Sequence, residues 1–167
     1  MVSVEYRAEL RDAHFATSIL RKIGATRIIS LDVVDTYFNI PSGTLKKREA
    51  QDEPVDFVFY ERKAIAGPKL CTFTIYSKEA AKQRYGVQPL PVLARVMKRR
   101  SIYMLGNVKI HIDDIEDIGT FIEFETLVSR ELNARHCHQQ INTLREKLAM
   151  LLGEPISQRY ADLVLVA

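Results

Sequence analysis

Charged side chains recur at every second residue in several segments of this sequence, and they are the residues best able to do chemistry. Glu5 and Arg7 form the first such pair, and Glu123 and Glu125 form the last. The other members of the pattern are Lys46 with Arg48, Lys98 with Arg100, and Lys109 with His111 and Asp113. Because side chains two residues apart on a β-strand point to the same side, each segment carries its charges on one face.

The opposite faces of these segments are apolar, with Val4, Tyr6, Ile110, Ile112 and Phe124 standing between the charged residues. The apolar face of each strand must pack against helices or other strands. The charged faces then either meet water outside or line the interior of a closed barrel. A solvated face is the usual arrangement for a single strand, but repetition over several strands favours a shared interior.

A shared interior would hold more positive than negative charge. The candidate bases are Arg7, Lys46, Arg48, Arg62, Lys69, Lys98, Arg100 and Lys109, and the candidate acids are Glu5, Asp113, Glu123 and Glu125. Arginine and lysine bind phosphate oxygens, and carboxylates bind hard cations such as Mg²⁺ or Mn²⁺. A triphosphate with a divalent metal fits such a basic interior with one acidic corner.

Antiparallel strands are the elements that must position these residues. Turn signals at Pro41-Ser42-Gly43, Ala66-Gly67-Pro68 and Gly106-Asn107 separate β-rich runs and predict hairpins. The expected strands are Val2–Leu10, Ile28–Phe38, Leu45–Glu49, Val55–Arg62, Lys69–Tyr76, Leu93–Leu105, Val108–Asp113 and Gly119–Leu127.

Apolar residues at helical spacing predict a helix between Asp12 and Gly24 and a long helix over Ser129–Leu152. A short helix is expected over Ser77–Arg84, and Tyr160–Val166 is expected to be a last strand. No repeat or linker interrupts the chain, so we expect a single domain over residues 1–167.

Composition excludes several classes of protein. Lys and Arg number 24 against 21 Asp and Glu, a balance too even for a general nucleic-acid coat, so no nucleic-acid partner is expected. Two cysteines make a disulfide framework improbable and fit a reducing compartment. No apolar run of signal or membrane-spanning length occurs, so we expect a cytoplasmic protein with no membrane partner.

Several of these segments, taken in order, resemble the CYTH family, the triphosphate tunnel enzymes that include class IV adenylate cyclases and thiamine triphosphatases. The resemblance is carried by Asp35-Thr36-Tyr37-Phe38, Leu45 to Glu49, Tyr60-Glu61-Arg62, Lys98 to Tyr103, Gly119 to Glu125 and Tyr160 to Leu163. It implies an α+β fold, a closed antiparallel β-barrel of about eight strands with helices outside, and commonly a homodimer.

The resemblance also implies roles for the charged residues. Glu5, Asp113, Glu123 and Glu125 would bind one or two divalent cations, Mg²⁺ or Mn²⁺, and the eight bases would bind the phosphates. Glu5, Arg7, Glu123 and Glu125 would form the catalytic centre. The sequence departs from the family pattern Glu-x-Glu-x-Lys, because the matching positions are Ser3, Glu5 and Arg7. Serine removes one carboxylate from the acidic corner, and we expect this to weaken a metal site.

Four functions remain open. The first is cyclisation of ATP to cyclic AMP and pyrophosphate. The second is hydrolysis of inorganic triphosphate, thiamine triphosphate or nucleotides. The third is binding of polyphosphate or nucleotide without catalysis, which Ser3 motivates, and the fourth is a protein-interaction domain with solvated charged strands.

Other polar residues have simpler interpretations. His136 and His138 point away from each other on a helix, so a metal cluster with Cys137 is not expected. Cys71 lacks a partner for nucleophilic work and is interpreted as packing. His111 lies on the charged face, where it either touches phosphate or forms an ordinary barrel contact. Arg99 points away from Lys98 and Arg100, which argues against a surface nucleic-acid patch.

Overall fold

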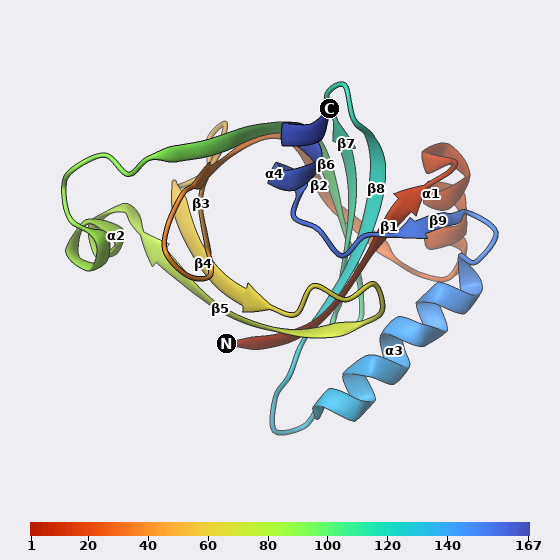
Figure 1. Cartoon of the computed structure of the whole chain (residues 1–167). Helices are drawn as coiled ribbons and strands as arrows, with labels where there is room; N and C mark the ends of the chain where they lie inside the picture. The colour runs from red at the N-terminus through yellow and green to blue at the C-terminus, as the bar shows by residue number, and fades with distance from the viewer.

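Nine strands of the computed structural model, which describes residues 1–167, form one antiparallel sheet that closes on itself (Figure 1). Their order is β5-β4-β3-β2-β6-β7-β8-β1-β9, and a further pairing joins β5 to β1. The strands are β1 (Val2–Leu10), β2 (Thr26–Phe38), β3 (Thr44–Ala50), β4 (Asp56–Arg62), β5 (Lys69–Ser77), β6 (Val92–Leu105), β7 (Val108–Ile115), β8 (Gly119–Leu127) and β9 (Leu152–Pro155). The expected closed barrel of eight strands is confirmed, with β9 as an addition.

Strand β1 closes the barrel by pairing with three other strands. Its first half lies beside β5, from Val2 opposite Thr72 to Glu5 opposite Lys69. Its second half lies beside β9, while β8 runs along its other edge. Since the backbone groups of β1 and β5 hydrogen-bond to each other, the eight-stranded barrel has no free edge of the kind that promotes aggregation.

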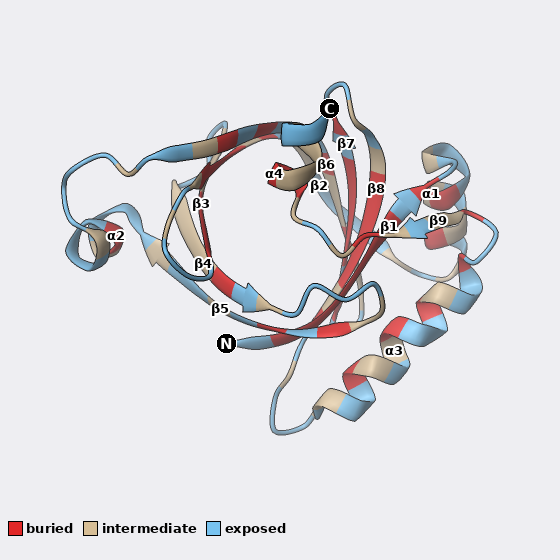
Figure 2. Cartoon of the chain, in the orientation of Figure 1, coloured by how far each residue is buried: buried red, intermediate tan, exposed pale blue.

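The helices α1 (Ala13–Lys22) and α3 (Ala134–Lys147) lie on the outside of the barrel (Figure 1). Val4, Tyr6, Ile110 and Phe124 pack with them in one buried cluster, so the apolar faces of β1, β7 and β8 point outward to these helices. Figure 2 shows these three strands buried along most of their length. The charged faces of the same strands therefore point into the barrel, because neighbouring side chains alternate.

Side-chain caps fix where the helices begin. Asp12 accepts a hydrogen bond from the backbone N–H of Phe15 at the start of α1, and Asn133 accepts one from that of His136 at the start of α3. Ser77 does the same for α2 (Lys78–Tyr85). None of the helices is both long enough and apolar enough to cross a membrane.

The prediction of a last strand at Tyr160–Val166 is wrong, since this segment is the helix α4. A reciprocal cap starts it, in which the Asp162 carboxylate accepts from both the backbone N–H and the guanidinium of Arg159. Tyr160, Leu163 and Val164 then lie on one helical face and pack against the barrel. The apolar end of this short segment is compatible with a strand, but the cap and the contacts with the barrel stabilise a helix.

The long predicted helix is also shorter than expected. Instead of covering Ser129–Leu152, α3 starts at Ala134 and ends at Lys147. The backbone N–H of Ser129 bonds to the carbonyl of Leu132 in a turn, and the chain after Leu151 becomes β9. Pairing with the free second half of β1 explains this change, because it satisfies backbone groups that a longer helix would leave exposed.

Tyr160 carries α4 into the barrel. Its ring lies 5.4 Å from that of Phe121, and only 1% of the residue is exposed. We predict that Tyr160→Ala lowers the free energy of unfolding by about 3–5 kcal/mol, because it leaves a large cavity. Leu165→Ala, at a position 54% exposed on the same helix, should change it little. Urea unfolding of both variants measures the difference, and equal effects would contradict the anchoring role of Tyr160.

Candidate active site

The barrel encloses a cavity of about 420 Å³ whose wall contains most of the predicted site residues. Those that line it are Glu5, Arg7, Lys46, Arg48, Arg62, Arg100, Lys109, Glu123 and Glu125. They come from β1, β3, β4, β6, β7 and β8, so residues far apart in the sequence meet in one chamber. The cavity volume lies in the range typical of small-molecule sites.

Three predicted residues lie outside the lining of this cavity. The Lys69 ammonium donates to the backbone carbonyls of Ile65 and Ile156. Lys98 and Asp113 are held in fully buried ion pairs on the inner side of β6 and β7. All three are therefore held by hydrogen bonds or ion pairs within the protein.

Asp35 organises the basic part of the cavity. Its carboxylate is fully buried and accepts two hydrogen bonds from Arg48, both at 2.9 Å, and one from Lys98 at 2.9 Å. The Lys46 ammonium lies 3.5 Å away. Burial alone would raise the pKa of Asp35, but Lys46, Lys98 and Arg48 outweigh it and hold that pKa well below its usual range. One carboxylate thus faces three cations, which leaves a local excess of positive charge.

This excess is energetically costly for the lysines. Burial, partly offset by Asp35, lowers the pKa of Lys46 well below its usual value. Burial together with Arg100 lowers the pKa of Lys98 to about 8. Buried cations that are only partly neutralised favour binding of an anion, because the anion restores the missing charge balance.

A second buried group joins β6, β7 and α4. Arg100 donates two hydrogen bonds to Asp113, at 2.7 and 2.8 Å, and the Tyr160 hydroxyl donates a third at 2.9 Å. Burial opposes ionisation of Asp113, but Arg100 and Lys98 hold its pKa below the usual range. Asp113 therefore holds the Arg100 side chain, which lines the cavity, and its carboxylate oxygens are already bonded to Arg100 and Tyr160.

Two further carboxylates of the cavity, Glu123 and Glu5, are held in ion pairs with arginines. Glu123 accepts from the Arg7 guanidinium at 2.6 Å, and Arg7 stacks over the ring of Tyr160 at 3.8 Å. Glu5 accepts from Arg62 at 2.9 Å. These ion pairs fix the positions of both guanidinium groups.

Ser3 occupies the position at which the family pattern has glutamate. Its hydroxyl donates to Glu5 at 3.2 Å, and the residue is fully buried. Ser3 thus lies beside the acidic group, as its place on the strand predicts, but it supplies no charge.

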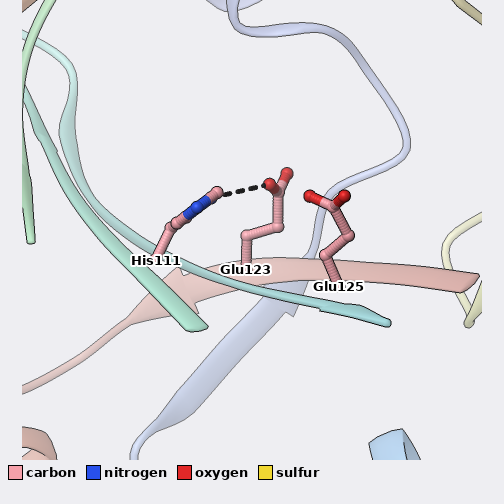
Figure 3. Close-up of side chains that lie close together, drawn as sticks. All are labelled: His111, Glu123 and Glu125. Carbon is pink, nitrogen blue, oxygen red and sulfur yellow. Dashed lines mark hydrogen bonds and ion pairs between the residues drawn. The ribbon is translucent and has the colours of Figure 1, made fainter. Parts of the chain in front are cut away.

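His111, Glu123 and Glu125 form a group able to hold a metal ion (Figure 3). One ligand atom from each lies within 4.8 Å of the others. His111 Nδ1 is 3.1 Å from a Glu123 oxygen, and the two residues are directly opposite on β7 and β8. Burial and then Arg100 lower the pKa of His111 to about 4, so the ring is neutral and able to bind a metal.

Glu125 completes this group. Burial, with Glu123 and Glu5 nearby, raises the pKa of its carboxyl group to about 7. A divalent cation would relieve the repulsion among these carboxylates, and a set of two carboxylates and one imidazole suits such an ion. The residues therefore fit a divalent metal, with Glu5 next to the group and Asp113 outside it.

Sequence reasoning missed Asp35 as a site residue and left the role of His111 open. The signal for Asp35 was its place in a β-branched strand, two residues from Val33 and two from Tyr37. An acid at such a position faces the same side as its apolar neighbours and needs a buried partner. Hairpin pairing supplies one, because Asp35 lies opposite Arg48.

A closed antiparallel barrel with a basic interior and an acidic corner able to hold a metal ion is the architecture of the triphosphate tunnel folds. Residues 1–155 match the CYTH domain, and the chain belongs to the CYTH family. A comparison with curated proteins finds no match.

Solved structures share this fold. The PH1012 protein from Pyrococcus horikoshii OT3 is 21% identical, with a TM-score of 0.79, covering 96% of this chain and 98% of its own. A candidate adenylate cyclase from Vibrio parahaemolyticus is 16% identical, with a TM-score of 0.75, covering 99% and 98%. HpAC1 from Hippeastrum, a candidate adenylyl cyclase with a dominant triphosphatase activity, is 12% identical, with a TM-score of 0.65, covering 98% and 96%. Because these sequence identities are low, the comparisons show that the proteins share a fold.

The Asp35 group gives a test of the site's electrostatics. We predict that Asp35→Asn lowers the free energy of unfolding by about 3–5 kcal/mol near pH 7, because it leaves buried cations without their carboxylate. Since the pKa of Asp35 is lower in the folded than in the unfolded state, this contribution is present above about pH 4 and is lost on further acidification. The gap between variant and parent should therefore narrow below that pH.

Asp32→Asn is the matched control on the same strand. The Asp32 side chain is 81% exposed and pairs only with the exposed Arg99. Its loss should change stability by less than about 1 kcal/mol. Denaturant unfolding between pH 3 and pH 7 measures both variants, and a gap that stays constant over this range would contradict the assignment.

Proposed function

We propose that this protein is a metal-dependent enzyme that processes triphosphates inside its barrel. The observation that carries the proposal is the excess of positive charge around Asp35, in the same cavity as the His111, Glu123 and Glu125 group. A polyanion bound with a divalent cation would satisfy both groups at once. The cations around Asp35 alone would indicate only an anion, and the His111, Glu123 and Glu125 group alone would indicate only a metal ion.

The bases would bind the phosphate chain. Lys46, Arg48 and Arg100 line the cavity from β3 and β6, and Arg7, Arg62 and Lys109 line it from other strands. Most of these cations are already held by carboxylates, so they need little reordering when the substrate binds. Such preorganised charges stabilise the negative charge of phosphoryl or nucleotidyl transfer.

His111, Glu123 and Glu125 would hold the metal ion, with Glu5 beside them. When bound, a divalent cation neutralises phosphate charge and stabilises the negative charge on the attacking and leaving oxygens of the reaction. We propose Mg²⁺ or Mn²⁺ for this role. Arg7 keeps Glu123 in place through its 2.6 Å ion pair.

The finer proposal is a reaction like that of a class IV adenylate cyclase. The 3′-hydroxyl of ATP would lose its proton to solvent as its oxygen forms a bond to the α-phosphorus, the bond from that phosphorus to the oxygen bridging to the β-phosphate would break, and pyrophosphate would leave. In a triphosphatase, water would attack the terminal phosphorus of inorganic triphosphate, thiamine triphosphate or a nucleotide, the bond from that phosphorus to the bridging oxygen would break, and phosphate and the diphosphate would be released. A cytoplasmic homodimer remains the expected setting.

Ser3 favours a second candidate function, a polyphosphate- or nucleotide-binding module without catalysis. Its hydroxyl donates to Glu5, where a carboxylate would instead add to the metal site. Incubation of ATP, thiamine triphosphate and inorganic triphosphate with Mg²⁺ or Mn²⁺ separates the candidates when cyclic AMP, pyrophosphate and phosphate are all measured. Binding of a triphosphate without formation of any product would support the binding module. Absence of both binding and product would contradict both candidate functions.

Ligand binding should be visible as stabilisation. We predict that inorganic triphosphate with Mn²⁺ stabilises the fold by about 2.7 kcal/mol at 100 times its Kd, and that monophosphate at the same concentration does far less. Arg48→Ala should reduce the shift, while Arg99→Ala, on the outer face of β6, should not. Thermal melts of the three proteins measure this, and equal shifts with both ligands would contradict a site for a phosphate chain.

The metal group gives a separate prediction. Glu125→Gln should weaken Mn²⁺ binding about 10- to 100-fold, because it removes a charged ligand without changing the shape of the side chain. Anion binding measured without metal should persist. The control is Glu116→Gln, at an exposed turn residue. Isothermal titration with Mn²⁺ measures the effect, and unchanged affinity in Glu125→Gln would remove this residue from the metal site.

A further inference from the structure

A further cavity, of about 440 Å³, lies at the end of the barrel where α4 packs against β6 (Figure 1). We call it the second cavity, and the one that holds the charged site the first cavity. The walls of the second cavity are the turn between β2 and β3, the end of β4 with the loop that follows, and the segment from Ser157 that leads into α4. None of the candidate metal ligands lies in these walls, so the second cavity differs in chemistry from the first.

The register of β3 and β4 shows that the two cavities follow each other along the barrel. Lys46 lies opposite Val58, and both residues line the first cavity. Two residues further along each strand, Thr44 lies opposite Tyr60; Thr44 lines the second cavity, and Tyr60 lines both. Arg62, two residues after Tyr60 and on the same face of β4, also lines both cavities. The two cavities therefore meet at Tyr60 and Arg62.

Side chains rather than backbone form the boundary between the cavities. The Arg62 guanidinium donates to Glu5 at 2.9 Å and lies 5.0 Å from the centre of the Tyr60 ring. Arg7 also reaches the boundary, because its guanidinium donates at 3.5 Å to the backbone carbonyl of Gln158, which lines the second cavity. Side chains change rotamer far more readily than strands separate, so this boundary is able to open without unfolding of the barrel. Both of its guanidinium groups attract anions.

The second cavity attracts anions less strongly than the first. Its wall carries two arginines, Arg62 and Arg159, and two carboxylates, Glu61 and Asp162. Arg159 is paired with Asp162 at 2.7 Å, and Arg62 is paired with Glu5. An anion would meet guanidinium groups there without the excess of positive charge found in the first cavity. Weak binding of this kind suits a passage, because an ion that is bound tightly does not leave.

Apolar packing closes another part of this end of the barrel. Val96, Phe121 and Tyr160 belong to one buried cluster, to which Ile156 also contributes. Such a cluster offers an anion no hydrogen bonds in place of water, so an anion that leaves at this end would follow the polar wall of the second cavity.

We propose that the second cavity is a passage through which inorganic phosphate or pyrophosphate moves between the first cavity and solvent, with Arg62 and Tyr60 as its gate. The proposal rests on the proposed function, because it assumes that phosphates bind in the first cavity. It adds a route for the inorganic product that is separate from the opposite mouth of the barrel, where the exposed residues Ile29 and Ile75 line the first cavity.

Ala64→Trp tests the passage, and Ala66→Trp is its matched control. Both alanines are exposed in the loop between β4 and β5, but Ala64 lines the second cavity and Ala66 lines neither cavity. Ser157→Trp is a second blocking variant, from another wall of the second cavity. Exchange NMR of ³¹P with pyrophosphate and Mg²⁺ measures the dissociation rate for each protein, and isothermal titration measures the Kd.

Blocking one of two routes to a site cannot change the equilibrium, so it should slow association and dissociation equally. We expect Ala64→Trp and Ser157→Trp to lower both rates about tenfold at unchanged Kd, and Ala66→Trp to behave as the parent does. Unchanged rates in both blocking variants would contradict the passage and leave the proposed function standing. A weakened Kd would do the same, because the second cavity would then belong to the binding site, and so would a parent that binds inorganic triphosphate but not pyrophosphate. If the parent binds neither ligand, the proposed function itself is overturned, and the passage with it.

Discussion

The structure depends on keeping buried cations charged inside a protein. Three of them, Lys46, Arg48 and Lys98, share the single carboxylate of Asp35, which is fully buried. Water solvates an ammonium or guanidinium far better than a protein interior does, so each cation needs a partner or a hydrated cavity. The barrel supplies both, and it leaves the positive charge around Asp35 only partly balanced.

Apolar side chains of the barrel strands pack outward, and this packing places the charged side chains inside. Val4, Tyr6 and Phe124 pack beneath α1 and α3 on the outside of the barrel. Since alternation fixes the opposite face, Glu5, Arg7, Glu123 and Glu125 have no place except the interior. By packing on the outer faces of these strands, α1 and α3 determine which side chains line the cavity, although neither helix contributes a residue to its wall. On the side without α1 and α3, β4 and β5 are free to place Val58 and Ile75 inside instead.

The sequence allowed the barrel and most of the cavity wall to be predicted, because both follow from a period of two that is local and repeated. Asp35 was missed although its hairpin partner Arg48 was predicted, because its buried position also depends on Lys98, 63 residues away, which no local pattern reports. Asp113 was grouped with Glu123 because they share a charged face, but Arg100 and Tyr160 hold it elsewhere. The helix α4 was mistaken for a strand because its short apolar end, Leu163 to Val166, does not distinguish the two, whereas its cap and its contacts with the barrel favour a helix.

The position of β1 has a consequence for how the chain reaches its native state. This strand precedes all of its partners along the chain, which lie at residues 69–72, 121–127 and 152–155. Contacts between such distant segments carry a large loop-closure entropy and slow folding. The barrel cannot close during synthesis until β8 has left the ribosome. Until then β1 has an unpaired edge of the kind that pairs with other chains.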